Sequence, residues 1–418
     1  MYIYKTLQNG IRVFAENIDY AESVSLGVWV GNGSRHESTE ENGMSHFIEH
    51  MVFKGTQTKS AKDIALQMDS VGGHINAFTT RECTCFYTKT LSEYTNVGMD
   101  ILSDMVFSPL LDGHDMDLER KVILEEIAMY EDSPEDVAYD VFSEAVWGDT
   151  PMGRPILGTV DTLNTITPDS MRRYMCEHYT SKNIIIAAVG KIYDSFFDEL
   201  EKFFGTRKIS DKDVTYEKAL YRPRSVCKPC DFEQVQLIAG FSGIDVYDER
   251  VYSLLVFNNI FGSGMSSRLF QNIREKHGLV YSISAGHSAY MDTGTFDILA
   301  GMSPENTKLV SELIEKEITN IKTNSVTDEE IDRAKIQLKG NYILSGEGIS
   351  AKMQAMGRAA LLDRPLKSRD EIISKIDLVN RESVEETMKT LLDGKTLSVI
   401  AVGPIENADE LFGGLRRK

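Results

Sequence analysis

Two segments of this chain, separated by half its length, carry the same residue pattern, and this repeat constrains the fold strongly. The stretch PDSMRRYMCEHYTSKNIIIAAVGKI (168–192) aligns with RESVEETMKTLLDGKTLSVIAVGPI (381–405) at one constant offset of 213 residues. Identical residues recur through both copies: Ser170 and Ser383, Met175 and Met388, Lys182 and Lys395, and the Ala-Val-Gly triplets at 188–190 and 401–403. Each copy predicts a helix with a polar face, a short turn and a buried strand that ends at glycine.

A second pair of segments lies at nearly the same separation. SVSLGVWVGNGSR (23–35) and QVQLIAGFSGIDV (234–246) both alternate core-forming residues with smaller or polar ones, as a strand covered on one face does. We therefore expect two copies of one unit, at 1–212 and 213–418. The charged, proline-containing segment 206–225 is the expected linker.

Strands and helices are grouped within each half, which favours an α+β fold over a doubly wound one. We expect two homologous α+β halves, each a mostly antiparallel sheet flanked by helices. The expected helices include 60–71, 115–131, 304–324 and 327–344, and the expected strands include 11–16, 24–31, 83–91, 184–189, 234–241, 295–301 and 396–402.

Charge and hydropathy exclude some classes of partner. A net charge of −19 argues against a nucleic-acid binder, because such proteins need a basic surface to displace counterions from phosphate. The longest apolar runs, such as 184–189, have the length of a strand and are far too short to span a membrane. The N-terminus shows neither a signal peptide nor a transit segment, so we expect a cytoplasmic protein without membrane contact.

Cysteines are few and odd in number. The chain has five, and the pair in CKPC, Cys227 and Cys230, invites a zinc or redox interpretation. A four-cysteine zinc site needs a second pair at matching spacing, whereas Cys83 and Cys85 have one residue between them. We expect structural or incidental thiols, and the sequence assigns no role to Cys227 and Cys230.

The motif HFIEHMVFKGT at 46–56 carries the clearest chemistry. His46 and His50 are four residues apart, so on a helix they project from one face and can share a metal ion. Neutral imidazoles suit zinc, and a catalytic zinc has three protein ligands and an open position. A third ligand must therefore come from elsewhere in the chain. The alternative is a solvated helix face that carries unrelated histidines.

The H-x-x-E-H spacing is the inverted zinc-peptidase signature, and the chain resembles the M16 metallopeptidases, in particular the short-chain class of the mitochondrial processing peptidase and its bacterial relatives. The resemblance covers nearly the whole length. Its motifs are LQNGIRVFAE (7–16), GMSHFIEHMVFKGT (43–56), GGHINAFTTRECTCFY (72–87), ERKVILEEIAMYEDSPED (119–136) and SSRLFQNIREKHGLVYS (266–282).

The resemblance implies a complete zinc site. Glu126 is the implied third ligand, and Glu119 is implied to support the site from behind the ligands. The two are seven residues apart and share a helical face, whereas the neighbour Glu125 points about 100° away. Glu49 is the implied general base, which takes a proton from water and passes it to the leaving amine.

The resemblance also implies substrate contacts in the first half. Phe53 is expected to line the pocket after the cleavage site, although a core role is equally open. Asn76 and Ala77 are expected to pair with an extended peptide that adds to an edge strand; the alternative is an edge hairpin without a ligand. Asp136 and Asp140 match acidic positions that hold a basic side chain upstream of the cut, or are ordinary acids at a helix start.

Two further residues are implied in the second half. Arg274 and Tyr281 match residues that reach the zinc site and contact substrate, through a carbonyl or a developing oxyanion. Without the resemblance, Arg274 is a surface charge on an amphipathic helix. At an offset of 211, positions 46–50 fall on FNNIF at 257–261, which has no metal ligand.

The resemblance therefore predicts a zinc endopeptidase whose two halves form one half of a clam-shell chamber. It implies one Zn²⁺ per chain, a homodimer, and substrates that are unfolded or short peptides. The acidic charge weakly favours basic peptides. The alternative function is a noncatalytic scaffold or partner subunit of a heteromeric processing complex.

Overall fold

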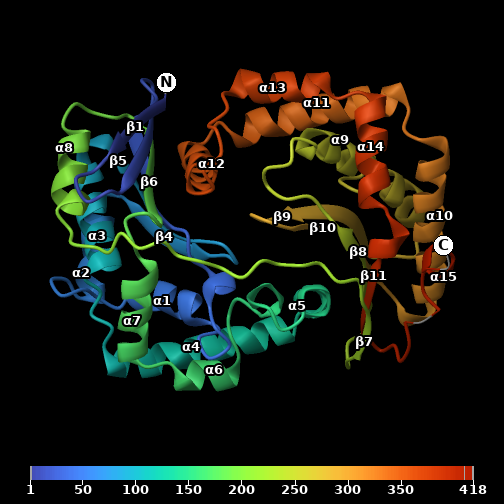
Figure 1. The fold of residues 1–418 in the computed structure, drawn as a ribbon, viewed down its shortest axis with the longest axis horizontal. Helices are drawn as coiled ribbons and strands as arrows, with labels where there is room; N and C mark the ends of the chain where they lie inside the picture. The colour runs from blue at the N-terminus through green and yellow to red at the C-terminus, as the bar shows by residue number, and fades with distance from the viewer. Residues whose placement is uncertain (1, 409, 417–418) are drawn as a thin grey trace. The chain divides into compact units, whose positions relative to one another are not determined.

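A computed structural model of the chain describes residues 2–408 and 410–416. They divide into two compact units, each built on one β-sheet (Figure 1). The first unit comprises Met1–Ile127, Arg154–Glu217 and Ser345–Leu366, and the second comprises Ala128–Gly153, Lys218–Leu344 and Lys367–Lys418. The expected α+β class is confirmed.

The sheet of the first unit has the strand order β1-β2-β6-β3-β5-β4. Only β2 and β6 pair in parallel; the other neighbours are antiparallel. The strands are β1 (Tyr2–Thr6), β2 (Arg12–Asn17), β3 (Ser23–Val30), β4 (His74–Thr79), β5 (Thr84–Leu91) and β6 (Ile184–Gly190).

The sheet of the second unit repeats this arrangement. Its order is β7-β11-β8-β10-β9, and only β7 and β11 are parallel. Without β1, the two sheets match in order and in the direction of every pairing, which confirms the internal repeat. The strands are β7 (Ser225–Pro229), β8 (Val235–Ser242), β9 (Ser282–Ala289), β10 (Gly294–Met302) and β11 (Ser398–Gly403).

Helices of the first unit bury their apolar sides against one face of its sheet, and Phe47 and Met51 of α1 are fully buried there. Threonine and serine side chains cap several of these helices, as Thr167 does at the start of α7. The helices are α1 (Met44–Val52), α2 (Ala61–Ser70), α3 (Thr95–Phe107), α4 (Gly113–Glu131), α6 (Val160–Thr165), α7 (Pro168–His178) and α8 (Phe196–Leu200), which continues into a π-helical turn, η4 (Glu201–Gly205).

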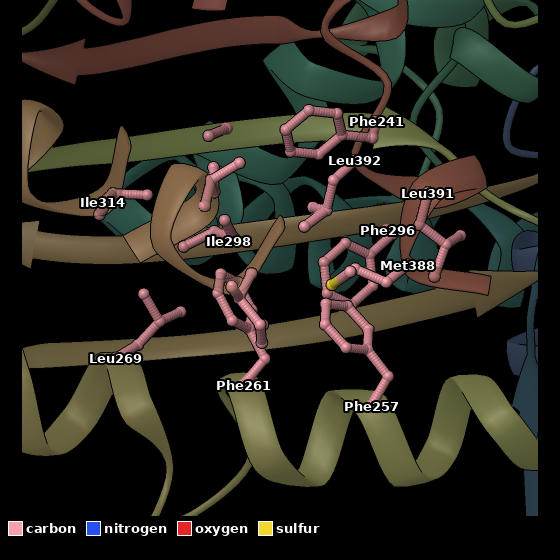
Figure 2. Packing of buried hydrophobic residues seen from close by; sticks show 14 of the residues in the cluster. Phe241, Phe257, Phe261, Leu269, Phe296, Ile298, Ile314, Met388, Leu391 and Leu392 are labelled. Carbon is pink, nitrogen blue, oxygen red and sulfur yellow. The ribbon is translucent and has the colours of Figure 1, made fainter. Parts of the chain in front are cut away.

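Several phenylalanine side chains pack together in the core of the second unit. Phe257 and Phe261 stack with ring centroids 5.3 Å apart, and Phe296 packs beside them (Figure 2). The helices are α5 (Pro134–Trp147), α9 (Val251–Phe261), α10 (Thr307–Asn324), α11 (Asp328–Ser345), α13 (Arg369–Leu378), α14 (Arg381–Leu391) and α15 (Gly413–Arg416), with a π-helical turn, η5, at Phe270–Glu275. Single 3₁₀ turns occur at Ser34–His36, Ser92–Tyr94, Pro151–Gly153, Pro304–Asn306 and Gly394–Thr396.

Two helices are exchanged between the sequence halves. Helix α12 (Ile349–Leu361) comes from the second half but packs on β3 and β6 of the first unit. Helix α5 comes from the first half but packs on β8 and β11 of the second unit. Because α12 begins 215 residues after α5, the exchanged helices are equivalent in the repeat. The compact units therefore differ in composition from the halves 1–212 and 213–418, whose division stays a prediction from the repeat.

Each exchanged helix fits its sheet through a large residue opposite a glycine. In the first unit the large residue is Trp29 of β3, and a Cβ on Gly357 of α12 would lie 2.2 Å from its indole nitrogen. In the second unit the large residue is Phe142 of α5, and a Cβ on Gly240 of β8 would lie 2.3 Å from its ring. The large residue is on the strand in one unit and on the helix in the other.

The expected linker, 206–225, has no helix or strand in the described chain from 206 to 224, and one of the points where the chain passes between the units, Glu217 to Lys218, falls within it. Its role as the linker between two halves stays a prediction. Among the described residues, none of the helices combines the length and the apolar character needed to cross a membrane.

Candidate metal centre

Helix α1 carries both motif histidines, and its start is fixed by a buried carboxylate. Glu37 is 1% exposed and accepts hydrogen bonds from the backbone N–H groups of Gly43 (2.8 Å) and Ser45 (2.7 Å). These N–H groups are otherwise unpaired at a helix start, so Glu37 acts as the missing cap. Gly43 has φ +93°, and a Cβ there would lie 2.8 Å from the Leu157 carbonyl, so a glycine is required.

His46 and His50 lie on one face of α1, as the spacing predicts. Their ring centroids are 4.6 Å apart. The Nε2 atoms of His46 and His50 lie 3.7 and 3.6 Å from Oε2 of Glu126 on α4. The potential ligand atoms of the three residues all lie within 4.8 Å of one another, which is a spacing that one metal ion could bridge.

The protonation of this cluster suits a cation. Burial and, to a smaller extent, the nearby His50 together lower the pKa of His46 to about 3, so His46 is neutral at physiological pH. Two imidazole nitrogens and one carboxylate oxygen form the His₂Glu donor set of catalytic zinc sites. These residues therefore fit zinc.

A second glutamate of α4 orients His50. Glu119, 7% exposed, lies 2.9 Å through Oε1 from Nδ1 of His50, and the Lys54 ammonium contacts its Oε2. An Nδ1–H that donates to Glu119 leaves the Nε2 lone pair directed toward Glu126. Glu119 thus lies behind His50, on the side of the ring away from Glu126. Lys54 was missed by the sequence analysis, although it lies within the same motif.

Glu49 lies beside the cluster but is not one of its three members. It is half-buried, and its Oε2 accepts a 2.5 Å hydrogen bond from the hydroxyl of Thr79 at the end of β4. Burial raises the pKa of Glu49, and the Thr79 hydrogen bond opposes that rise. Thr79 is a second residue that sequence reasoning missed. Its position in the GGHINAFT motif was the available signal.

The expected substrate residues of the first unit lie near α1 and on β4. Phe53 follows α1 directly and is half-buried against the core, which leaves both of its expected roles open. Asn76 is exposed and Ala77 is half-buried. Both belong to β4, which is the last strand of its sheet and pairs only with β5 among the described residues.

The other expected substrate residues belong to the second unit. Asp136 is half-buried in the first turn of α5, and Asp140 is exposed one turn later. Arg274 is exposed in η5, with its guanidinium over the Phe270 ring at 4.9 Å. Tyr281 is 59% exposed, and its hydroxyl lies 3.2 Å from that of Ser303. Their part in binding or reaction stays a prediction.

Two alternative interpretations lose support. Glu125 is exposed and lies outside the three-residue cluster. None of the five cysteines is in a disulfide. Of the two cysteines of CKPC, Cys227 packs against the hydrophobic core of the second unit, and Cys230 packs against the cluster under α5. At positions 257–261, the counterpart of the zinc motif, Phe257 and Phe261 fill the core.

Comparisons with known proteins identify the family of the chain. Residues 12–160 match the family described as insulinase (peptidase family M16), and residues 165–338 match the peptidase M16 inactive domain. The uncharacterised zinc protease YmxG of Bacillus subtilis is 42% identical over 92% of this chain and 94% of its own length. An uncharacterised zinc protease of Streptomyces coelicolor is 35% identical, over 96% of this chain and 89% of its own.

Solved structures show the same fold. A protease from Helicobacter pylori superposes with a TM-score of 0.91 at 20% identity, covering 97% of this chain and 99% of its own. A peptidase M16 inactive domain from Pseudomonas fluorescens gives a TM-score of 0.90 at 17% identity, covering 98% and 100%. The resemblance noted from the sequence is confirmed, and the chain belongs to the M16 family of zinc peptidases.

Proposed function

We propose that this chain is a zinc-dependent endopeptidase that holds one Zn²⁺ and hydrolyses peptide bonds. The observation that carries the proposal is the convergence of His46, His50 and Glu126 from two helices, with the carboxylate of Glu49 beside them and outside the ligand set. Such hydrolysis uses one carboxylate that binds the metal and a second carboxylate, not bound to the metal, that acts as the general base.

The roles of the residues follow from their chemistry. His46, His50 and Glu126 would hold the metal, which supplies Lewis acidity that polarises a carbonyl and acidifies water. Glu49 accepts a proton from the attacking water as its oxygen bonds to the scissile carbonyl carbon. Glu49 then delivers that proton to the amide nitrogen as the C–N bond breaks, so the carboxylate is regenerated. Glu119 keeps His50 oriented throughout.

The proposed substrates are unfolded or short peptides. The free edge of β4 supports this, because an extended peptide can add to it through backbone hydrogen bonds near Asn76 and Ala77. We assign the pocket after the cleavage site to Phe53.

Contacts from the second unit are also part of the proposal. Asp136 and Asp140 would bind a basic side chain upstream of the cut, and Arg274 and Tyr281 would contact substrate at the reacting bond. We further propose a cytoplasmic homodimer, which rests on the resemblance to chamber-forming relatives.

Metal analysis together with digestion of an unstructured basic peptide tests the function. We expect the native chain to retain zinc and cleave the peptide, and Glu49→Gln to retain zinc with cleavage lowered by about two to four orders of magnitude. Equal cleavage by both proteins would refute the mechanism. A native chain without zinc or cleavage would favour the noncatalytic alternative.

The third ligand needs a matched control. Glu126→Gln should bind zinc more weakly, since a neutral amide replaces an anionic ligand, whereas Glu125→Gln makes the same change at the exposed neighbour and should retain zinc. If both variants retained native zinc content, the third ligand would lie elsewhere.

A further inference from the structure

The hydroxyl of Thr79 joins the edge strand β4 to the carboxylate of Glu49. Thr79 is the last residue of β4, and it donates to Oε2 of Glu49 at 2.5 Å. In the described part of the chain, no hydrogen bond to Oε1 of Glu49 is found. One oxygen of the carboxylate is therefore engaged, and the other is available to accept a proton.

Local structure holds this hydroxyl in place. Thr79 pairs with Thr84 across the β4–β5 hairpin, and the Thr84 hydroxyl donates to the backbone carbonyl of Asn32 at 2.9 Å. The hairpin turn is closed by the Thr80 hydroxyl, which accepts the backbone N–H groups of Glu82 (3.2 Å) and Cys83 (3.0 Å). Because a β-branched side chain has few χ1 rotamers, a fixed backbone also fixes the Thr79 hydroxyl.

Thr79 shares a strand face with residues that pack toward α1. Successive side chains alternate across a strand, so Ile75, Ala77 and Thr79 lie on one face and Phe78 on the other. Ile75 and Ala77 pack against the core that contains α1, whereas Phe78 packs against Trp29 in a different cluster. The hydroxyl reaches Glu49 from the strand that we propose binds the peptide.

We infer that Thr79 is a positioning residue for the general base. Its hydroxyl fixes one oxygen of Glu49 and so holds the side chain in one rotamer, in which the other oxygen faces the reacting water. The inference rests on the proposed peptidase function and adds a residue to it. A peptide seated on β4 would in this way be bound by the same strand that orients the base.

The test replaces Thr79 by valine, which keeps the β-branched shape and removes the hydroxyl. A hydrogen bond to a charged group contributes enough to predict a drop in kcat of about 10- to 100-fold. Zinc content, thermal stability and KM should stay near native, because Thr79 is not a metal ligand and Thr79→Val keeps the backbone through which β4 would bind a peptide. Thr79→Ser restores the hydroxyl and should recover most of kcat.

A double variant separates positioning from a structural role. If Thr79 acts through Glu49, then Thr79→Val should change the residual rate of Glu49→Gln by less than about 2-fold. A native kcat in Thr79→Val, or loss of zinc and stability in both Thr79 variants, overturns the inference while the proposed function stands. A native chain that neither holds zinc nor cleaves peptide overturns the proposed function and this inference with it.

Discussion

The fit of the exchanged helix α12 can be tested with one methyl group. In Gly357→Ala, the new Cβ would lie 2.2 Å from Nε1 and 2.3 Å from Cε2 of Trp29. Contacts this short require the indole or the helix to shift, and Trp29 is only 2% exposed and enclosed by core. The same face of β3 is close to α12 at a second point, since a Cβ on Gly27 would lie 2.6 Å from the Met353 sulfur.

Two opposing effects set the magnitude. Overpacking a core costs about 1–3 kcal/mol, and the depth of this overlap indicates the upper end. Alanine is favoured over glycine within a helix by about 1 kcal/mol. The net expectation is a loss of about 2 kcal/mol, which lowers the Tm of a unit of this size by about 4–8 °C.

A matched glycine predicts the opposite sign. Gly340 lies inside α11, and a Cβ there would meet nothing within 4 Å, so Gly340→Ala should stabilise by about 1 kcal/mol. The two tryptophans belong to different units, so Trp29 fluorescence in a Trp147→Phe background reports Gly357→Ala in the first unit, and Trp147 fluorescence in a Trp29→Phe background reports Gly340→Ala in the second. If Gly357→Ala were as stable as Gly340→Ala, the proposed fit between α12 and the sheet would be wrong.

Three further predictions concern the metal centre and a buried acid. Lys54→Met should weaken zinc binding in chelator competition, because it removes the cation that holds Glu119, whereas Lys121→Met, on the exposed face of α4, should not; equal affinities would refute the role. Removal of zinc by a chelator should lower the stability of the first unit by about 3 kcal/mol relative to metal at 100 times its Kd, seen by tryptophan fluorescence; an unchanged Tm would contradict it. Burial raises the pKa of Asp297 from 3.8 to about 6, although the Tyr139 hydroxyl donates a hydrogen bond to it. The folded state therefore holds the proton more tightly than the unfolded state does. The stability that this contributes is fully present below pH 3.8 and is lost as pH rises through 6. Asp297→Asn should therefore be more stable than the native chain at pH 7, by about 2–3 kcal/mol, and lose this advantage near pH 4 in denaturant titrations.

Sequence reasoning reached the parts of the site that short-range spacing controls. His46 and His50 share a face because a helix turns once in 3.6 residues, and Glu119 and Glu126 share a face for the same reason. Which face of α4 contacts α1 depends on how the two helices pack in the tertiary structure. The choice of Glu126 over Glu125 therefore needed the family resemblance.

Contacts between residues that are far apart in the sequence could not be predicted from it. Thr79 lies 30 residues from Glu49, and Lys54 lies 65 residues from Glu119; neither spacing has a periodic signature. These contacts exist because the β4–β5 hairpin and α4 pack around α1. Packing of this kind depends on the shape of whole elements.

By itself, the sequence determined the internal repeat, the α+β class and the histidine pair. The repeat follows from segments at a constant spacing, and the other two follow from local periodicity. Only the tertiary structure decided that α5 and α12 exchange places between the halves. Equivalent helices of a repeat have similar patterns, so hydrophobicity alone does not assign either helix to a sheet. The assignment follows from steric fit: Trp29 leaves room only for Gly357, and Phe142 needs the space above Gly240.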